Sequence, residues 1–252
     1  MHEYLYHVMS LCYIYILILV VIVNPPGEYN IDLCKELLPF YQLLNEGEIE
    51  LLSKNSNIVR YKKKDIIFRQ STRTSHIMLV ISGLVKIFKE GRNDRIIILK
   101  IATPGNYIGL LSLMGDQIHQ YSASAIGECQ ICFIDFNAFK NIILENSKFG
   151  LNLLTIISKD GLFIFERLLN QSHKQLPGRI ADVLLYFANE IYGQQKFVFP
   201  FTRRELAELA GTTKESFIRT LTEFKNDKII NLTGSEVELV SMDIINTLSE
   251  LG

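Results

Sequence analysis

The 252-residue sequence predicts an α+β fold of three parts in series: a region of short β-strands, one long helix, and a small helical module closed by a β-hairpin. Between about Asn57 and Phe136, short strand-like runs alternate with glycine turns, which is typical of a β-sandwich or roll. From about Phe149 to Ser172, apolar or small residues recur every three or four positions, which indicates one face of a helix. Beyond residue 173, two helix-start signals lie close together around a single glycine.

Length and charge limit the classes of protein to consider. A chain of 252 residues can hold two domains of ordinary size. Its net charge is −1, so the whole molecule is not a general binder of polyanions, and its basic residues must act locally. Lysines and arginines do gather in the last third of the chain, where acidic residues offset much of their charge. We therefore expect modest nonspecific affinity for polyanions, which salt removes readily.

Residues 1–30 form an apolar N-terminal extension. The stretch from Val8 to Val23 carries no charged side chain and is slightly short for a membrane span. It lacks the basic start and the small-residue cleavage site of a signal peptide. Two interpretations follow: a membrane anchor, or a start assigned upstream of the true one, since recognisable domain sequence begins only near Ile31.

Residues 31–147 are assigned to the β-roll. Glycines stand where turns are needed between its strands, because glycine adopts positive φ at little cost. These positions are Gly83, Gly91, the Pro104-Gly105 pair and Gly109.

Residues 148–172 are assigned to the long helix, which carries an apolar or small seam at spacings of three and four. The seam consists of Leu151, Leu154, Gly161, Phe165 and Leu168, with Ile157 or Ser158 between them. One helix cannot bury such a seam alone, so we expect it to pair with a second copy; the alternative is packing against its own β-roll. Gly161 lowers helix stability and permits close approach of two chains.

Residues 173–252 are assigned to the helical module. Pro177 suits the first turn of a helix, and residues Gln171 to Gln175 form the expected hinge before it. Thr202 and Glu205 fit a capping box that starts a helix at about Arg203, and Gly211 is expected to end that helix in a tight turn. Thr212 to Glu215 repeats the capping pattern and starts a second helix at about Thr213, which predicts a helix-turn-helix.

The second helix has an apolar face at Phe217, Leu221 and Phe224 and a polar face opposite. In a helix-turn-helix the polar face enters the DNA major groove, where arginine or lysine reads guanine and carboxylates accept from cytosine. The base-reading candidates are Lys214, Glu215, Ile218 and Arg219, and the phosphate-contacting candidates are Thr202, Arg203 and Thr213. The alternative is an ordinary solvated helix face.

Lys228 to Val240 reads as a hairpin turning at Thr233-Gly234-Ser235, followed by a helix from about Ser241. Together with the segment FTRRELAELAG and the downstream RTL, this winged module resembles the CRP/FNR family of bacterial transcription regulators. The resemblance implies a cyclic-nucleotide-binding-type β-roll and a cytoplasmic homodimer. It also implies a pseudo-palindromic site on double-stranded DNA and contact with RNA polymerase.

The resemblance also places a tentative effector pocket at Gly109, Leu110, Tyr121 and Ser122. Family members that bind cyclic AMP carry a glutamate at the Leu110 position and an arginine beside the serine. This chain has His119-Gln120-Tyr121-Ser122 there, without the guanidinium that would hold a cyclic phosphate. We therefore expect control by an effector or signal other than cyclic AMP, for which an unknown small molecule is one candidate, and a surface loop position for His119.

No metal, cofactor or enzymatic activity is predicted. Cys132 matches a cluster ligand of the oxygen-sensing branch of the family, but the close N-terminal cysteine group is absent: Cys12 and Cys34 lie far apart. Cys129 and Cys132, three apart in a strand, should point to opposite faces. His76 and His119 are too few for a cupin-like metal enzyme. The alternative function is a membrane-tethered sensor that acts through protein partners.

Overall fold

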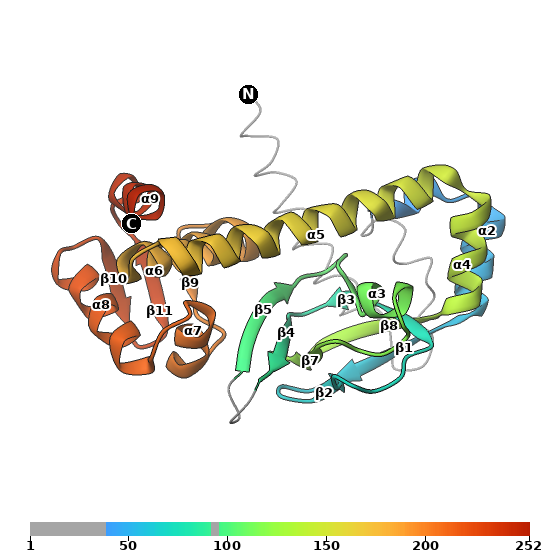
Figure 1. Cartoon of the computed structure of the whole chain (residues 1–252), viewed down its shortest axis with the longest axis horizontal. Coiled ribbons are helices and arrows are strands. Elements are labelled where there is room, and N and C mark those ends of the chain that lie inside the picture. Colours follow the sequence, from blue (N-terminus) through green and yellow to red (C-terminus); the bar gives the residue numbers. More distant parts are fainter. Residues whose placement is uncertain (1–38, 92–95) are drawn as a thin grey trace, which may run out of the picture.

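The computed structural model describes residues 39–91 and 96–252. The apolar extension 1–30, its stretch Val8 to Val23, and Cys12 and Cys34 lie outside the described residues. Figure 1 shows the expected series: a β-roll, one long helix that runs past it, and a C-terminal module at the far end of that helix. None of the helices within the described residues is both long enough and apolar enough to span a membrane.

The roll is built from two four-stranded antiparallel sheets, ordered β1-β8-β3-β6 and β2-β7-β4-β5. The strands are β1 (Ser56–Tyr61), β2 (Ile66–Phe68), β3 (His76–Ser82), β4 (Val85–Glu90), β5 (Ile96–Ala102), β6 (Tyr107–Ile108), β7 (Ser122–Ala125) and β8 (Cys129–Asp135).

The core of the roll follows from the alternation of side chains along each strand. On β8, Cys129 and Ile131 point into the cluster shared with Val85 and Ile87 of β4. Cys132 belongs to a second cluster, under the helices that cover the outer side of its sheet. The two cysteines therefore occupy opposite faces of the strand, as expected, and both are buried free thiols.

Short helices cover the outside of the first sheet and lead to the long helix. They are η2 (Pro39–Leu43), α2 (Glu46–Lys54), α3 (Leu110–Met114) and α4 (Phe136–Glu145). The long helix α5 (Ser147–His173) has 27 residues and begins where the Asn146 side chain accepts a hydrogen bond from the backbone of Phe149. It extends one residue beyond the expected range at each end.

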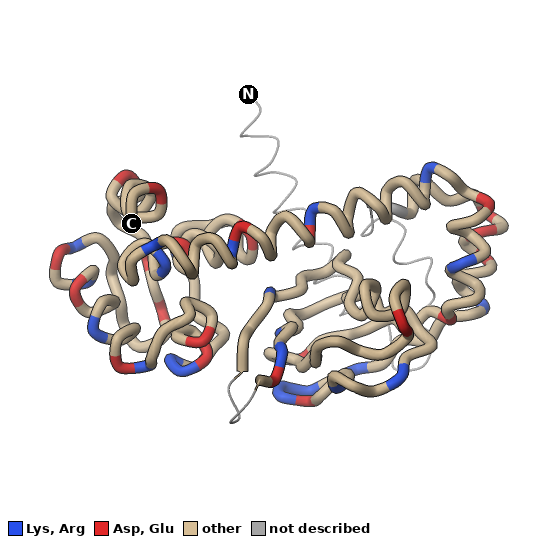
Figure 2. The backbone as a smooth tube through the Cα atoms, in the orientation of Figure 1, with Lys and Arg blue, Asp and Glu red and all other residues tan. Residues whose placement is uncertain are grey.

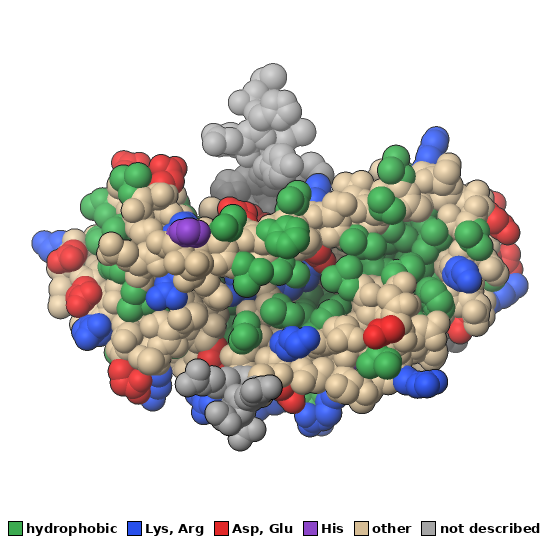
Figure 3. Space-filling view, in the orientation of Figure 1, with side chains coloured by type: hydrophobic (Ala, Val, Ile, Leu, Met, Phe, Trp, Pro, Cys, Tyr) green, Lys and Arg blue, Asp and Glu red, His purple; other side chains and the backbone are tan. Residues whose placement is uncertain are grey.

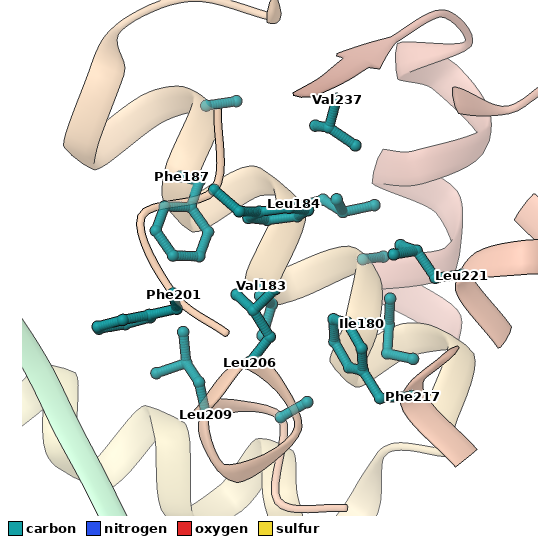
Figure 4. Packing of buried hydrophobic residues seen from close by; sticks show 14 of the residues in the cluster. Ile180, Val183, Leu184, Phe187, Phe201, Leu206, Leu209, Phe217, Leu221 and Val237 are labelled. Atoms are coloured by element: carbon teal, nitrogen blue, oxygen red, sulfur yellow. The ribbon is translucent and has the colours of Figure 1, made fainter. Parts of the chain in front are cut away.

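The C-terminal module contains α6 (Leu176–Leu185), the π-helical segment η4 (Tyr186–Tyr192), β9 (Lys196–Val198), α7 (Arg203–Leu209), α8 (Lys214–Asn226), β10 (Ile230–Thr233), β11 (Glu236–Leu239) and α9 (Met242–Leu251). The expected hairpin is β10 and β11, and β9 adds a third strand in the order β10-β11-β9. Figure 4 shows how Leu184, Phe187, Leu206, Phe217 and Leu221 from α6, η4, α7 and α8 meet in one core.

The roll and the C-terminal module share part of that core. Ile98 and Ile101 of β5 belong to the same buried cluster as Leu206 and Leu209 of α7. The Tyr186 hydroxyl accepts a hydrogen bond from the Ile101 amide at 3.0 Å. Direct packing therefore joins the two parts, in addition to the covalent connection through α5.

Candidate nucleic-acid interface

The first helix of the helix-turn-helix starts at a capping box. The Thr202 hydroxyl accepts from the Glu205 amide at 3.3 Å, and the Glu205 carboxylate accepts from the Thr202 amide at 3.0 Å. These two hydrogen bonds satisfy donors that a helix start leaves unpaired, and they fix where α7 begins. The predicted capping box is confirmed.

The turn after α7 is a Schellman motif centred on Gly211. The Gly211 amide donates to Glu208 O at 3.2 Å and the Thr212 amide donates to Ala207 O at 2.9 Å. Gly211 has φ +64°, and a Cβ at this position would lie 3.2 Å from the Gln171 side chain. The backbone conformation favours glycine here, and the close approach of the Gln171 side chain from α5 leaves little room for a Cβ.

The second helix begins differently from the expectation. Its N-cap is Thr213, whose side chain accepts from the Ser216 amide at 3.2 Å. The third helical position is therefore Ser216, and the Thr212–Glu215 pairing proposed as a second capping box is wrong by one residue. Glu215 lies in the first turn, where its negative charge favours the helix N-terminus and leaves the carboxylate exposed.

The four base-reading candidates lie on one exposed face of α8. Lys214, Glu215 and Arg219 are exposed, and Ile218 is 39 % exposed, whereas Phe217 and Leu221 on the opposite face are buried. None of the ion pairs found within residues 39–91 and 96–252 involves Lys214, Glu215 or Arg219. Their functional groups are available to a ligand of this face, and Figure 2 shows the mixed charges along α7 and α8.

The three phosphate-contacting candidates already have intramolecular roles. The hydroxyls of Thr202 and Thr213 cap the two helices. Arg203 donates through Nη2 to the carbonyl of Gly234 in the hairpin turn, and its guanidinium lies 5.5 Å from the centre of the Phe199 ring. Burial lowers the pKa of Arg203. Arg203 thus joins α7 to the hairpin, a role that the sequence pattern did not reveal.

The seam of α5 is exposed in the single chain. Leu151, Leu154, Phe165 and Leu168 are between 59 % and 68 % exposed, and a Cβ on Gly161 would contact nothing within 4 Å. Leu162 and Leu169 lie beside this seam and are equally exposed, so the apolar face is broader than expected. Figure 3 shows apolar side chains gathered along the helix. The exposed seam residues do not pack against the chain's own roll, whereas Ile157 is half-buried against the roll's core cluster.

The tentative effector residues do not form one open site. The Gly109 amide donates to the Tyr121 hydroxyl at 3.1 Å, and burial raises the pKa of Tyr121 to about 12. Leu110 packs into the core between the roll and its covering helices. Ser122 is fully buried, and its hydroxyl accepts from the Gln70 amide at 2.9 Å. This hydrogen bond joins Gly109 to Tyr121, and the space that a side chain at Gly109 would fill is occupied by Met78 and His119.

His119 is not a surface residue. It is 3 % exposed and stacks on Phe68 with ring centroids 3.8 Å apart. Burial lowers its pKa, and its Nδ1 is buried without a hydrogen-bond partner in the described part of the chain. His119 does lie in a loop, but the expected surface position was wrong because this loop folds back onto the glycine turn at Gly109, where a Cβ would lie 3.2 Å from the imidazole ring. His119 borders a cavity of about 380 Å³ that Arg69, Arg73 and His76 also line.

Sequence reasoning missed the residues that join the roll to the helix-turn-helix. Arg167 donates from Nη1 to Ile98 O at 2.9 Å and from Nη2 to Leu209 O at 2.8 Å, so one guanidinium bridges β5 and the end of α7. Lys86 of β4 is paired with Glu205. The sequence did contain a signal for this contact, because Arg167 is a charged residue on the side of α5 that faces away from the apolar seam.

No group of three or more potential metal ligands occurs among the residues that the structure describes.

Comparison with known proteins agrees with this architecture. Residues 58–146 match the model of the cyclic nucleotide-binding domain, and residues 178–245 match the Crp-like helix-turn-helix domain. The chain is 24 % identical over 201 residues to the CRP-like cAMP-activated global transcriptional regulator of Mycobacterium tuberculosis, covering 78 % of this chain and 90 % of that protein. It is 25 % identical over 183 residues to the transcriptional activator protein Anr of Pseudomonas protegens, covering 71 % and 75 %.

Solved structures show the same fold. FixK2 from Bradyrhizobium japonicum superposes with a TM-score of 0.71 at 18 % identity, over 77 % of this chain and 96 % of FixK2. The c-di-GMP responsive global regulator CLP of Xanthomonas campestris gives 0.66 at 22 % identity, over 77 % and 99 %. These relatives are transcription regulators and not enzymes. With a cyclic-nucleotide-binding roll followed by a Crp-like helix-turn-helix, the chain belongs to the CRP/FNR family of transcription regulators.

Proposed function

We propose that this protein is a homodimeric, sequence-specific DNA-binding transcription regulator, controlled by a small molecule other than cyclic AMP. The observation that carries the proposal is the exposed face of α8, where Lys214, Glu215 and Arg219 take part in none of the ion pairs found among the described residues and Ile218 is exposed beside them. A helix that starts at a capped turn and buries its other face is positioned as a recognition helix.

The types of side chain on this face suit major-groove recognition. Arg219 can donate two hydrogen bonds to guanine O6 and N7, and Glu215 can accept from cytosine N4. Ile218 can contact a thymine methyl group. Thr202, Thr213 and Arg203 lie at the helix starts, where amide and side-chain donors commonly hold phosphates and so set the orientation of the module.

Dimerisation would cover the α5 seam and supply the second recognition helix. Paired helices with apolar positions at spacings of three and four bury their seam against each other. A twofold dimer would present its two α8 helices to half-sites about 34 Å apart, which predicts a pseudo-palindromic target. RNA polymerase is the further partner we infer from the family, and the cytoplasm is the corresponding location.

The effector is proposed to differ from cyclic AMP because the residues at the expected pocket lack its counter-charge. Tyr121 stands beside Gly109 where a guanidinium would be needed, and the Ser122 hydroxyl is already bonded to Gln70. A buried cyclic phosphate without a guanidinium would lose a charge-assisted bidentate contact that carries much of its specificity.

The test is selection of bound sequences from a random DNA library by the whole chain at two salt concentrations. A twofold-symmetric motif with a fixed guanine in each half-site is expected. If no motif is enriched, the selection is repeated with small-molecule extract added. Absence of any motif in both selections would contradict the proposal and favour action through protein partners.

A further inference from the structure

The structure contains a cavity at the junction of α5 with the C-terminal module. Its volume is about 230 Å³, and its walls come from α5, α6, η4 and the end of α7. On α5 the lining residues Phe163, Arg167 and Asn170 recur at spacings of four and three, so they share one face. Arg167 is two positions from the seam residue Phe165, which places it about 200° around the helix. The face that lines the cavity is therefore opposite the seam. Dimerisation through the seam would leave the cavity uncovered.

Two guanidinium groups connect this cavity to the helix-turn-helix. Arg167 holds the Leu209 carbonyl at the end of α7, and Arg179 Nη1 donates to the carbonyl of Gly211 at 2.9 Å. Both carbonyls belong to the turn that leads into the recognition helix. A ligand that competes for these donors would therefore act directly on the position of that turn.

The polar groups of the cavity that are not engaged by other residues indicate which groups a ligand must carry. Arg179 Nε is buried and has no hydrogen-bond partner among the residues that the structure describes, so an acceptor such as a carboxylate would satisfy it. Glu166 and Glu190 line the cavity, are exposed, and take part in none of the ion pairs found among the described residues. Asp182, in contrast, is already neutralised by Lys174 at 2.7 Å and bonded to Ser249.

Part of the remaining wall is apolar and aromatic, with Phe163, Val183 and Leu185, while neutral polar side chains such as Asn170, Gln171 and Asn189 line the rest. The volume lies below the roughly 300 Å³ at which pockets for drug-sized ligands begin, so the ligand must be small. Lining carboxylates disfavour a dianionic phosphate, because like charges this close raise the cost of binding. A small ligand with a carboxylate, an ammonium group and an apolar side chain would match the Arg179 donor, the two glutamates and the apolar part of the wall.

We infer that this hinge cavity, lined by Arg179, Glu166, Glu190 and Phe163, binds a free apolar amino acid or a zwitterion of the same size. The ligand carboxylate takes a place beside the Arg179 guanidinium, the ammonium group faces the glutamates, and the side chain lies against Phe163. Ligand binding itself does not depend on the proposed function. Only its consequence rests on that function, because a shift of the Gly211 turn would change the affinity for DNA.

The binding step is tested without DNA, by isothermal titration of the whole chain with L-leucine and L-phenylalanine. The matched probes are 2-phenylethylamine, which lacks the carboxylate, and 3-phenylpropionate, which lacks the ammonium group. At least one amino acid is expected to bind, and each matched probe to bind about tenfold or more weakly, since each loses a charge-assisted contact.

Two variants locate the site. Arg179→Gln removes the charge, and Asn170→Trp fills the cavity from α5 without altering either arginine; both are expected to abolish the heat of binding. Arg204→Gln, on the exposed side of α7, is the control and should bind as the unaltered chain does. Failure of both amino acids to bind, or binding that survives Asn170→Trp, overturns the inference. Failure of the DNA selection leaves this titration unaffected, so the two proposals fail separately.

Discussion

Lys86 Nζ lies 2.7 Å from Glu205 Oε1, which pairs a strand of the β-roll with the capping glutamate of the first helix of the helix-turn-helix. Both side chains are mostly buried, at 15 % and 25 % exposed. The same carboxylate accepts from the amide and the hydroxyl of Thr202. One acidic group therefore serves both the start of α7 and the contact between roll and module.

The first prediction concerns this pair. Burial raises the pKa of Glu205, but the hydrogen bonds from Lys86 and Thr202 outweigh burial and lower it overall. A lowered pKa in the folded state stabilises the protein above about pH 4.5, and this contribution is lost as the pH falls further. Lys86→Ala should lower the free energy of unfolding by about 1 kcal/mol at pH 7. The variant should also lose less of this free energy than the original chain when the pH is lowered. Urea unfolding at several pH values measures both effects.

Lys89→Ala is the matched control, because Lys89 lies on the same strand and is exposed. It should leave the unfolding free energy within about 0.5 kcal/mol of the original. Equal effects of the two alanine variants would show that the Lys86–Glu205 pair has no special role.

The second prediction concerns DNA recognition. Arg219→Ala should weaken binding by about 1–3 kcal/mol at a site with the selected guanine, and by much less at a site where that base pair is replaced. Competition binding with the two sites measures the ratio. Lys225→Ala, in the last turn of the same helix, should weaken both sites alike. A preserved ratio in Arg219→Ala would remove this residue from base reading.

The third prediction concerns the α5 seam. A glutamate placed at Leu154 or Phe165 would bury a charge in a helix pair, so either variant should dissociate the dimer. Sedimentation equilibrium should give twice 28.9 kDa for the unaltered chain and 28.9 kDa for the variants. Lys159→Glu changes charge away from the seam on the same helix and should remain dimeric. A monomeric unaltered chain would refute the dimer.

The fourth prediction concerns His119. Burial lowers the pKa of this imidazole, so its protonation opposes folding, and stability should decrease as the pH falls below about 6.5. His119→Phe keeps the ring stack on Phe68 and cannot be protonated. The change in thermal midpoint between pH 7.5 and pH 5.5 should be smaller in this variant than in the original chain. The same replacement at the exposed His76 should leave that pH dependence as it was.

The parts of the fold that depend on local sequence were predictable. The capping box at Thr202, the stop at Gly211 and the turn at Gly234 each depend on neighbours within a few residues. The helix-turn-helix and the hairpin were therefore expected where they occur. The cap of α8 was misplaced by one residue because both Thr212 and Thr213 offer a hydroxyl there, and in the structure Thr213 is the one that caps the helix.

The parts that depend on distant contacts were not predictable. Strand β9 is only three residues long, and it exists because Phe197 pairs with Val237, forty residues later. His119 becomes buried because Phe68 lies across it, and no local pattern indicates that stack. The contacts of Arg167 join three elements whose spacing in the sequence carries no period.

The roll and the C-terminal module share one buried core, which includes isoleucines of β5. This shared core limits how the domains of such regulators can be exchanged. Because Ile98 and Ile101 are covered by residues of the C-terminal module, grafting that module onto another sensor would leave both side chains in water. The exposed apolar area would promote aggregation of the remaining sensor. Any chimera of this protein must therefore carry β5 together with α7, and its boundary cannot simply be drawn at the end of α5.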